Sequence, residues 1–330
     1  MSTKTIETVK IDHADFNTRL DKILNDKLDC LPSRALASKL IQQGCVSLNG
    51  KTITKPATLF SEPSIIKVDV SFLTENKEAP KGEDIPLQVI YEDDDILVIN
   101  KEAHMVVHPG AGNSKHTLVN AILSHCQKAL PSLGEKTRAG IVHRLDKETS
   151  GVIVIAKSLK ALTHLSKQFS LHSQKRVYEA LVYGLLKDDK GVIETKITRD
   201  KKNRILFRAD SEKGRTAITE YTVKKRYYKA KLSFVECRLK TGRTHQIRVH
   251  MKHLHHAVVG DKHYKTPNQE HLIPKNVHMY LKKHVTHQLL HAKLLGLKHP
   301  KNEQDLEFTA KRPLILTKVL QFLDDFEKSV

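Results

Sequence analysis

A charged insert between two apolar runs is the feature that most constrains how this chain can fold. The runs Gly140–Val142 and Val152–Ile155 are short, rich in β-branched residues and bounded by glycine, which is typical of buried strands. The insert between them, His143–Ser150, must then be a loop whose two ends are held by the core. Loops held in this way commonly present reactive side chains.

The central carboxylate of this loop, Asp146, has a basic residue on either side, Arg144 and Lys147. Nearby cations favour the ionised form of a carboxylate even where it is partly desolvated. An ionised carboxylate can act as a nucleophile or a base rather than as an acid. Considered alone, such a residue is more often a salt-bridge or turn aspartate.

The charge of the chain indicates its class of partner. Lys and Arg outnumber Asp and Glu by 56 to 37, giving a net charge of +19. This excess predicts a polyanionic partner. A membrane is disfavoured, because no polybasic amphipathic helix and no apolar run of about 20 residues is found. The polar N-terminus lacks a signal-peptide core. The four cysteines lack paired spacing: Cys30, Cys45, Cys126 and Cys237. A cytoplasmic protein with reduced thiols is therefore expected.

Residues 1–75 are expected to form a small separate domain. Apolar residues recur at helical spacing from Leu20 to Leu28 and from Leu36 to Ile41, and Asn49-Gly50 predicts a β-hairpin. The runs RLDKIL, SRALASKLIQQGCVSLNGK and KPA resemble the S4 RNA-binding domain. The resemblance implies that five basic residues of this segment bind RNA: Arg19, Arg34, Lys39, Lys51 and Lys55. The alternative is that these residues only form a solvated surface.

A polar stretch rich in Pro and Gly separates this segment from the rest of the chain. It predicts a linker over residues 76–86 and a second domain over residues 87–330. The second domain opens with two apolar runs, 87–91 and 96–100, on either side of an acidic turn, which predicts a hairpin.

Several runs of the second domain together resemble one enzyme family. The loop sequence HRLDKETSG is similar to the catalytic motif of the RluA-type pseudouridine synthases, with Asp146 at the position of the catalytic aspartate. The runs YEDDDILVINKEAHMVVHP, RLKTGRTHQIRVHM, QLLHA and FTAKRP are similar to further family signatures. The chain departs from the family at Glu102 and His104, where Pro and Gly are usual.

The resemblance implies an α+β fold, in which an S4 domain precedes a mixed, mainly antiparallel sheet with helices around a central cleft. It implies that Tyr178 packs against the target base, that Ile247 contacts the base, and that Arg243 pairs with Asp146. Arg144 would fill the position vacated by a flipped base. The neighbouring motif residues His143 and Lys147 are assigned to substrate binding.

The implied reaction breaks the N-glycosidic bond of a uridine, rotates the base and rejoins it through carbon. All atoms are conserved, so no cofactor is expected. Asp146 would act on the sugar either as a nucleophile or by removing a ribose proton, and the sequence leaves both open. VHPGAGN and RAGIVHRLDK are most similar to family members that modify large-subunit RNA. The expected partner is a 23S rRNA stem-loop, free or within pre-50S or 50S particles, and the expected enzyme is a monomer.

Three alternatives remain open. A non-catalytic S4-type RNA-binding protein would explain the charge but not Asp146, Tyr178 and Arg243 together. The same reaction could serve another rRNA or a tRNA. A glycoside hydrolase or nucleosidase would need a second carboxylate, for which Glu148 is the near candidate. No metal is expected, because the clustered histidines match no zinc spacing: His253, His255 and His256.

Overall fold

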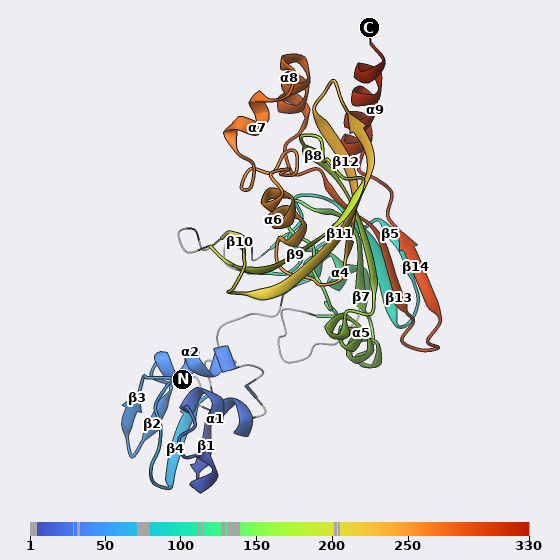
Figure 1. Cartoon of the computed structure of the whole chain (residues 1–330). Helices are drawn as coiled ribbons and strands as arrows, with labels where there is room; N and C mark the ends of the chain where they lie inside the picture. Colours follow the sequence, from blue (N-terminus) through green and yellow to red (C-terminus); the bar gives the residue numbers. More distant parts are fainter. Residues whose placement is uncertain are drawn as a thin grey trace. The chain divides into compact units, whose positions relative to one another are not determined.

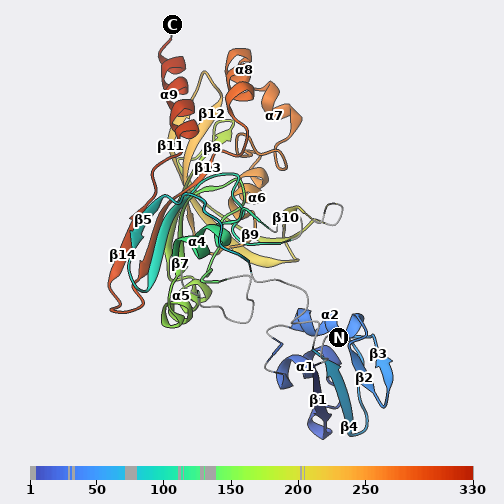
Figure 2. The same cartoon turned by 180° about the vertical axis from the view of Figure 1, so that it is seen from behind.

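The structure is a computed structural model that describes residues 5–329, except 29, 32–33, 71–79, 111–112, 114, 127–129, 131–138, 201–202 and 204. The chain divides into two compact units, residues 1–81 with 132–139 and residues 82–131 with 140–330 (Figures 1 and 2). Of the expected linker, residues 76–79 lie outside the described residues. Residue 82 already belongs to the second unit, where the backbone N–H of Glu83 donates to Asn120 O at 2.9 Å.

The first unit packs two helices against a small antiparallel sheet. The strands lie in the order β1-β4-β2-β3, and both helices bury leucine and isoleucine in one core with the sheet. Asn49 and Gly50 both have positive φ, as the tight turn of the β2–β3 hairpin requires. The predicted helices and hairpin are thus confirmed. The elements are β1 Ile6–Ile11, α1 Leu20–Lys27, α2 Arg34–Gln42, β2 Val46–Leu48, β3 Lys51–Ile53 and β4 Ser64–Asp69.

The second unit is built on a ten-stranded sheet in the order β10-β9-β11-β12-β8-β13-β7-β6-β5, with β14 paired to β13. Every pairing of these strands is antiparallel except that of β7 with β13. A mixed, mainly antiparallel sheet is therefore confirmed, as is the opening β5–β6 hairpin. The strands are β5 Val89–Glu92, β6 Ile96–Lys101, β7 Ser150–Ala156, β8 Lys175–Tyr183, β9 Lys190–Arg199, β10 Phe207–Asp210, β11 Arg215–Tyr227, β12 Leu232–Leu239, β13 Leu290–Lys298 and β14 Asp305–Thr309.

Helices cover separate parts of this sheet (Figure 1). One core lies between β6, β7 and β13 and the helices α4 and α5, whereas α8 and α9 close a second core with β8 and β12. Helix α6 packs against β9, β10 and β11. Among the described residues, no helix is long and apolar enough to cross a bilayer. The helices are α4 Leu118–Cys126, α5 Leu159–Leu171, α6 Gln246–His253, α7 Pro267–His271, α8 Lys275–His284 and α9 Leu314–Lys328.

The loop that carries Asp146 is held at both of its ends. Before it, Gly140 adopts φ +68° and its carbonyl accepts from Ala156 N at 2.8 Å. After it, Gly151 adopts φ +119° beside β13, where a Cβ atom would lie 2.2 Å from Ala292 O. No residue with a side chain fits there without moving β13. The expected strand at 140–142 is only a single bridge, Ile141 to Ile155, because the turn at Gly140 carries the chain off the sheet.

Candidate active site

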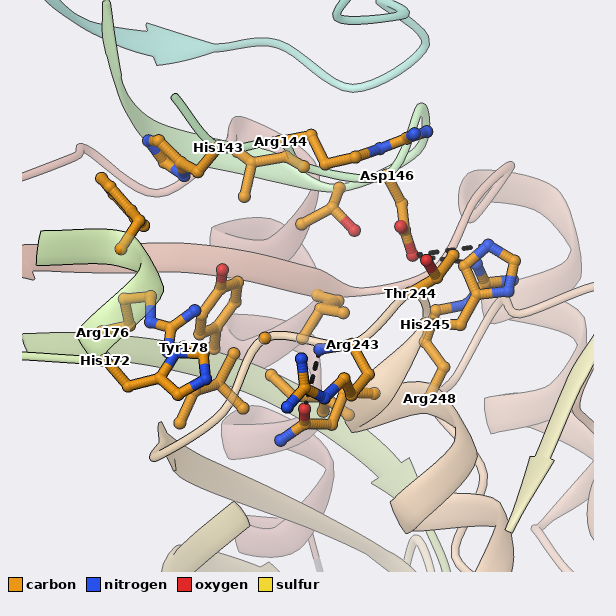
Figure 3. A pocket seen from close by; sticks show the side chains of 18 of the residues that line it. His143, Arg144, Asp146, His172, Arg176, Tyr178, Arg243, Thr244, His245 and Arg248 are labelled. Atoms are coloured by element: carbon orange, nitrogen blue, oxygen red, sulfur yellow. Dashed lines mark hydrogen bonds and ion pairs between the residues drawn. The ribbon is translucent and has the colours of Figure 1, made fainter. Parts of the chain in front are cut away.

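A cavity of about 680 Å³ lies in the second unit beside the Asp146 loop. Its walls come from the loop itself, the end of α5, the start of β8, and the segment that leads from β12 into α6 (Figure 3). Segments distant in the sequence therefore meet here. Asp146 is the sole carboxylate among the described residues that line the cavity.

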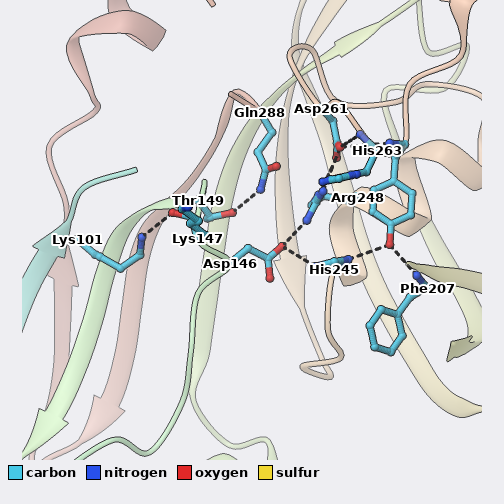
Figure 4. A network of polar contacts seen from close by, with 11 residues as sticks. Lys101, Asp146, Lys147, Thr149, Phe207, His245, Arg248, Asp261, His263 and Gln288 are labelled. Carbon is cyan, nitrogen blue, oxygen red and sulfur yellow. Dashed lines mark hydrogen bonds and ion pairs between the residues drawn. The ribbon is translucent and has the colours of Figure 1, made fainter. Parts of the chain in front are cut away.

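Asp146 is held by Arg248, the third residue of α6 (Figure 4). Arg248 Nη1 donates to Asp146 Oδ2 at 3.0 Å, while its Nε and Nη2 bind both oxygens of Asp261 at 2.6 and 3.0 Å. The Arg248 side chain is 5% exposed and that of Asp261 is fully buried. Burial opposes the charged form of Arg248, but Asp261 and then Asp146 raise its pKa above the ordinary value. One guanidinium thus fixes the orientation of the Asp146 carboxylate.

Arg243 does not make the expected ion pair with Asp146. Its Nε donates to Thr216 O at 2.9 Å, and its backbone N–H donates to Gln246 Oε1 at 2.9 Å. The chain then turns through His245, which has a left-handed φ of +57° at the start of α6. This turn separates Arg243 from the helical residue Arg248, which takes the place beside the carboxylate. Both arginines belong to the same sequence signature, so spacing alone did not distinguish them.

His245 lies between Asp146 and the aromatic residue Tyr264. Its Nε2 is 3.9 Å from Asp146 Oδ2, and its Nδ1 is 2.8 Å from the Tyr264 hydroxyl, which also accepts from Phe207 N at 2.9 Å. Burial lowers the pKa of His245 even though Asp146 is close. The imidazole is therefore neutral near pH 7, and Arg248 supplies the positive charge beside Asp146.

Tyr178 and Ile247 line the cavity and pack in one apolar cluster, together with Leu290. Burial raises the pKa of the Tyr178 hydroxyl to about 12, with Asp146 adding to the rise and Arg176 opposing it. The phenol therefore stays protonated at neutral pH. In Figure 3 its hydroxyl points toward the loop that carries Asp146. An aromatic ring and a branched aliphatic chain beside a carboxylate can hold a flat, neutral base.

The three other predicted loop residues have different surroundings. His143 Nε2 accepts from Val154 N at 3.0 Å, and its ring stacks on Phe169 at 4.4 Å. Burial, helped by the charge of Arg176, lowers the pKa of His143 to about 3, so a neutral His143 ties the loop to β7. Arg144 is exposed and lines the cavity, whereas the exposed Lys147 is not among the lining residues.

Lys101 supports the backbone of the loop and was missed in the sequence (Figure 4). It is 1% exposed, and its Nζ donates to the carbonyls of Glu102, Met105 and Lys147 at 2.7, 3.0 and 3.2 Å. Burial lowers its pKa to about 7, against the opposing charge of Asp146. A single lysine after an apolar strand gave no signal for this role. Gln288 adds a second support by donating to Thr149 Oγ1 at 3.0 Å.

In the first unit, two of the five expected RNA-binding residues share an acidic partner. Arg19 and Arg34 bind the buried Asp21 at 2.9 and 3.0 Å. The hydrogen bonds from Arg19, together with those from Arg34 and Ser38, hold the pKa of Asp21 well below its usual range. Lys39, Lys51 and Lys55 occupy exposed positions. The net charge of the five residues with Asp21 is therefore +4 rather than +5.

One group of potential metal ligands is found in the part of the chain that the structure describes. His104, Glu148 and His287 bring their ligand atoms within 4.8 Å of one another. Glu148 contacts His104 Nδ1 at 2.5 Å and is absent from the cavity lining. The second carboxylate that a glycoside hydrolase needs is therefore not found among the described residues that line the cavity with Asp146.

Comparison with known proteins agrees with this geometry. Residues 95–253 match the family model for RNA pseudouridylate synthase, and residues 18–62 match the S4 domain. The chain is 38% identical over 310 residues to an uncharacterized RNA pseudouridine synthase of Aquifex aeolicus, covering 93% of this chain and 94% of that protein. It is 40% identical over 295 residues to the ribosomal large subunit pseudouridine synthase D of Neisseria meningitidis serogroup A, covering 89% and 76%.

Among solved structures, the human RNA pseudouridylate synthase domain containing 1 shares the fold, with a TM-score of 0.55 at 22% identity over 76% of this chain and 97% of that one. The match to the Aquifex protein covers 93% of this chain, and the residues matched by the synthase family model, 95–253, contain the Asp146 loop and α6. The chain therefore belongs to the RNA pseudouridylate synthase family, as an enzyme with an S4 domain in its first unit.

Proposed function

We propose that this enzyme converts specific uridines of large-subunit (23S) ribosomal RNA to pseudouridine. The observation that carries the proposal is the Asp146 carboxylate, fixed by Arg248 at a cavity lined by Tyr178 and Ile247. The similarity to proteins named ribosomal large subunit pseudouridine synthase D supports the choice of RNA. The net charge of +19 supports a large polyanionic substrate.

The target nucleotide must leave its stack before Asp146 can reach the sugar. Base flipping costs a few kcal/mol and is least costly in a loop, so the substrate is a stem-loop. Arg144 is exposed on the same loop as Asp146, two residues away. Its planar guanidinium can stack and donate hydrogen bonds in the space that the base vacates.

The flipped uracil is then held by Tyr178 and Ile247 while Asp146 acts on the ribose. Asp146 either attacks C1′ or removes a ribose proton; in both cases the bond from C1′ to N1 breaks. The uracil turns within the cavity, and C5 bonds to C1′ as Asp146 leaves C1′ or, on the second route, returns the proton that it took from the ribose. The proton on C5 is then lost and N1 gains one. Atoms and electrons balance without a co-reactant. Arg248 holds the Asp146 carboxylate in alignment through its hydrogen bond to Oδ2.

The finer features of the substrate are part of the same proposal. The RNA is a 23S stem-loop, modified as free RNA or within a pre-50S or 50S particle, and the enzyme acts as a cytoplasmic monomer. Arg19, Arg34, Lys39, Lys51 and Lys55 contact RNA phosphates from the S4 domain. Lys147, exposed at the loop, contacts the backbone near the target.

Mapping of pseudouridines in 23S rRNA from a deletion strain tests the proposal. We expect sites that disappear in the strain, return with the wild-type gene, and do not return with Asp146→Asn. The purified Asp146→Asn protein should bind the same RNA fragment with wild-type affinity. A 23S map that does not change on deletion, with a lost site in another rRNA or a tRNA, would assign the reaction to that RNA. Release of free uracil would instead indicate a hydrolase.

A further inference from the structure

Arg176, at the start of β8, is a buried arginine with no acidic partner among the described residues. Arg176 is 9% exposed and lines the cavity. Neither its Nε nor its Nη2 has a hydrogen-bond partner among the described residues. Burial lowers its pKa, Tyr178 opposes that effect, and Arg243 adds to it. A buried charge without a partner is strongly unfavourable in an empty protein, so an anion is expected to complete it.

Two further basic side chains face the same part of the cavity. Arg243 Nε is occupied by Thr216 O, and burial with the charge of Arg215 lowers the pKa of this guanidinium. His172 caps the end of α5 in a left-handed conformation, and its Nδ1 is buried without a partner in the described part of the chain. In Figure 3, His172 and Arg176 lie beside Tyr178, and Arg243 lies between them and Arg248.

The backbone leaves room for the guanidinium group of Arg176. A Cβ atom on Gly242 would lie 2.5 Å from Arg176 Nη1, so the glycine lets the guanidinium approach the segment before α6. Of the arginines that line the cavity, only Arg248 pairs with carboxylates of the described residues. The other four have no such partner there: Arg144, Arg176, Arg215 and Arg243. The cavity is thus strongly electropositive on one side.

The chemistry of a nucleotide identifies the missing anion. In the bound substrate uracil and ribose are neutral, so the phosphodiester is the anion available to neutralise this group. Residues two apart on a strand point to the same face about 7 Å apart, which places Arg176 next to Tyr178, the proposed base platform. A base held by Tyr178 therefore brings the phosphate of its own or the adjoining nucleotide toward Arg176. The planar guanidinium suits two parallel hydrogen bonds to phosphate oxygens.

We propose that Arg176, Arg243 and His172 form a phosphate subsite that binds one phosphodiester flanking the uridine being isomerised. The subsite rests on the proposed function, because it takes the RNA of that reaction as its ligand. It positions the target nucleotide after flipping, so that C1′ lies beside Asp146. Its residues act in binding, whereas Asp146 acts in the chemical step.

The first test compares Arg176→Met and Arg176→Lys with Arg208→Met, which removes an arginine that is ion-paired on β10 and absent from the cavity lining. Arg176→Met should lower kcat/KM on an rRNA fragment about 10- to 100-fold, through KM, as expected for a lost charged hydrogen bond. Arg176→Lys should recover part of this. The thermal midpoint of Arg176→Met should be unchanged or higher, because an unpaired buried charge is removed. A lower midpoint with unchanged KM would overturn the subsite.

The second test replaces one linkage at a time with a neutral methylphosphonate, on the 5′ or the 3′ side of the target uridine. Only one of the two should weaken wild-type turnover, and that linkage should have no further effect in Arg176→Met. Arg208→Met should remain sensitive to it. Fully additive losses at both linkages would show that Arg176 does not bind either phosphate.

A binding test separates failure of the subsite from failure of the proposed function. Uridine, uridine 5′-monophosphate and uridine 3′-monophosphate are titrated into the full chain and followed by ligand-observed NMR, without turnover. One monophosphate should bind wild type about 10-fold more tightly than uridine, and Arg176→Met should abolish the difference. Equal binding of all three ligands to wild type refutes the subsite, even if rRNA is modified. An inactive wild type that keeps the phosphate preference refutes only the choice of RNA.

Discussion

Replacing Arg248 with methionine should damage both stability and catalysis, by amounts that the structure predicts separately. The side chain lies almost fully buried between Asp146 and Asp261. Its loss leaves the Asp261 carboxylate buried without its cation. Breaking a buried pair typically costs about 3 to 5 kcal/mol. Since Asp261 keeps the backbone N–H groups of His263 and Tyr264 at 3.0 and 3.2 Å, we expect a loss near 3 kcal/mol.

The catalytic loss follows from the other end of the same guanidinium. Asp146 loses a charged hydrogen bond of 3.0 Å, worth about 1.5 to 3 kcal/mol, which corresponds to roughly a 10- to 150-fold lower kcat. Urea unfolding followed by far-UV circular dichroism measures the first effect. Tritium release from RNA labelled at uracil C5 measures the second, because that proton leaves when the new bond forms.

A double variant separates the two effects. In Arg248→Met with Asp261→Asn no buried charge is left unpaired, so most of the stability should return. Activity should stay low, because Asp146 still lacks its partner. The matched control is Arg243→Met, which should raise KM and leave kcat near wild type. Recovery of kcat in the double variant, or a larger kcat loss in Arg243→Met than in Arg248→Met, would refute the role given to Arg248.

Three further outcomes are expected. Tyr178→Phe should retain RNA binding, and Tyr178→Leu should lose more activity than Tyr178→Phe. If the Tyr178→Leu variant turned over as fast as wild type, Tyr178 would be a core residue only. Removing residues 1–75 takes away five basic side chains, two of which share Asp21, so we expect about four phosphate contacts to be lost and the log–log salt slope of RNA binding to flatten by about 3. An unchanged slope would mean that this surface makes no RNA contacts. Burial lowers the pKa of Lys101 from 10.5 to about 7, so between these pH values the unfolded chain binds one more proton than the folded chain. Wild type should therefore gain stability relative to Lys101→Met as the pH rises from 7 to 10.5. A difference that does not rise would contradict the lowered pKa.

The parts of the fold that were predicted correctly depend on local patterns. Leu20 to Leu28 repeats at helical spacing, and Asn49-Gly50 supplies the two positive φ values that its hairpin requires. The strand at Val152–Ile155 is buried on both faces and has the expected apolar run. The run at 140–142 has the same composition, yet it forms one bridge only. Composition did not reveal that Gly140 turns the chain.

The site shows where sequence spacing stops being informative. The loop that carries Asp146 is one continuous motif, so its content could be predicted. The partner of Asp146 depends on Asp261, a residue thirteen positions beyond Arg248 that fixes this guanidinium and had no pattern of its own. Lys101 and Arg176 were missed for the same reason. Their roles arise from burial, together with the three carbonyls that Lys101 binds and the acidic partner that Arg176 lacks among the described residues. None of this is visible before the chain is folded.

The short parallel pairing of β7 with β13 also sets the order of events during synthesis on the ribosome. The first unit is almost complete once residue 81 has emerged. The loop around Asp146 closes only when Gly151 can pair with Ala292, and Ala292 emerges about 210 residues after residue 81. At about 5 to 20 residues per second, this delay is roughly 10 to 40 seconds. Throughout that interval the S4 domain can fold and engage RNA while no active site exists. The nascent chain is therefore able to bind its RNA well before it can modify a uridine.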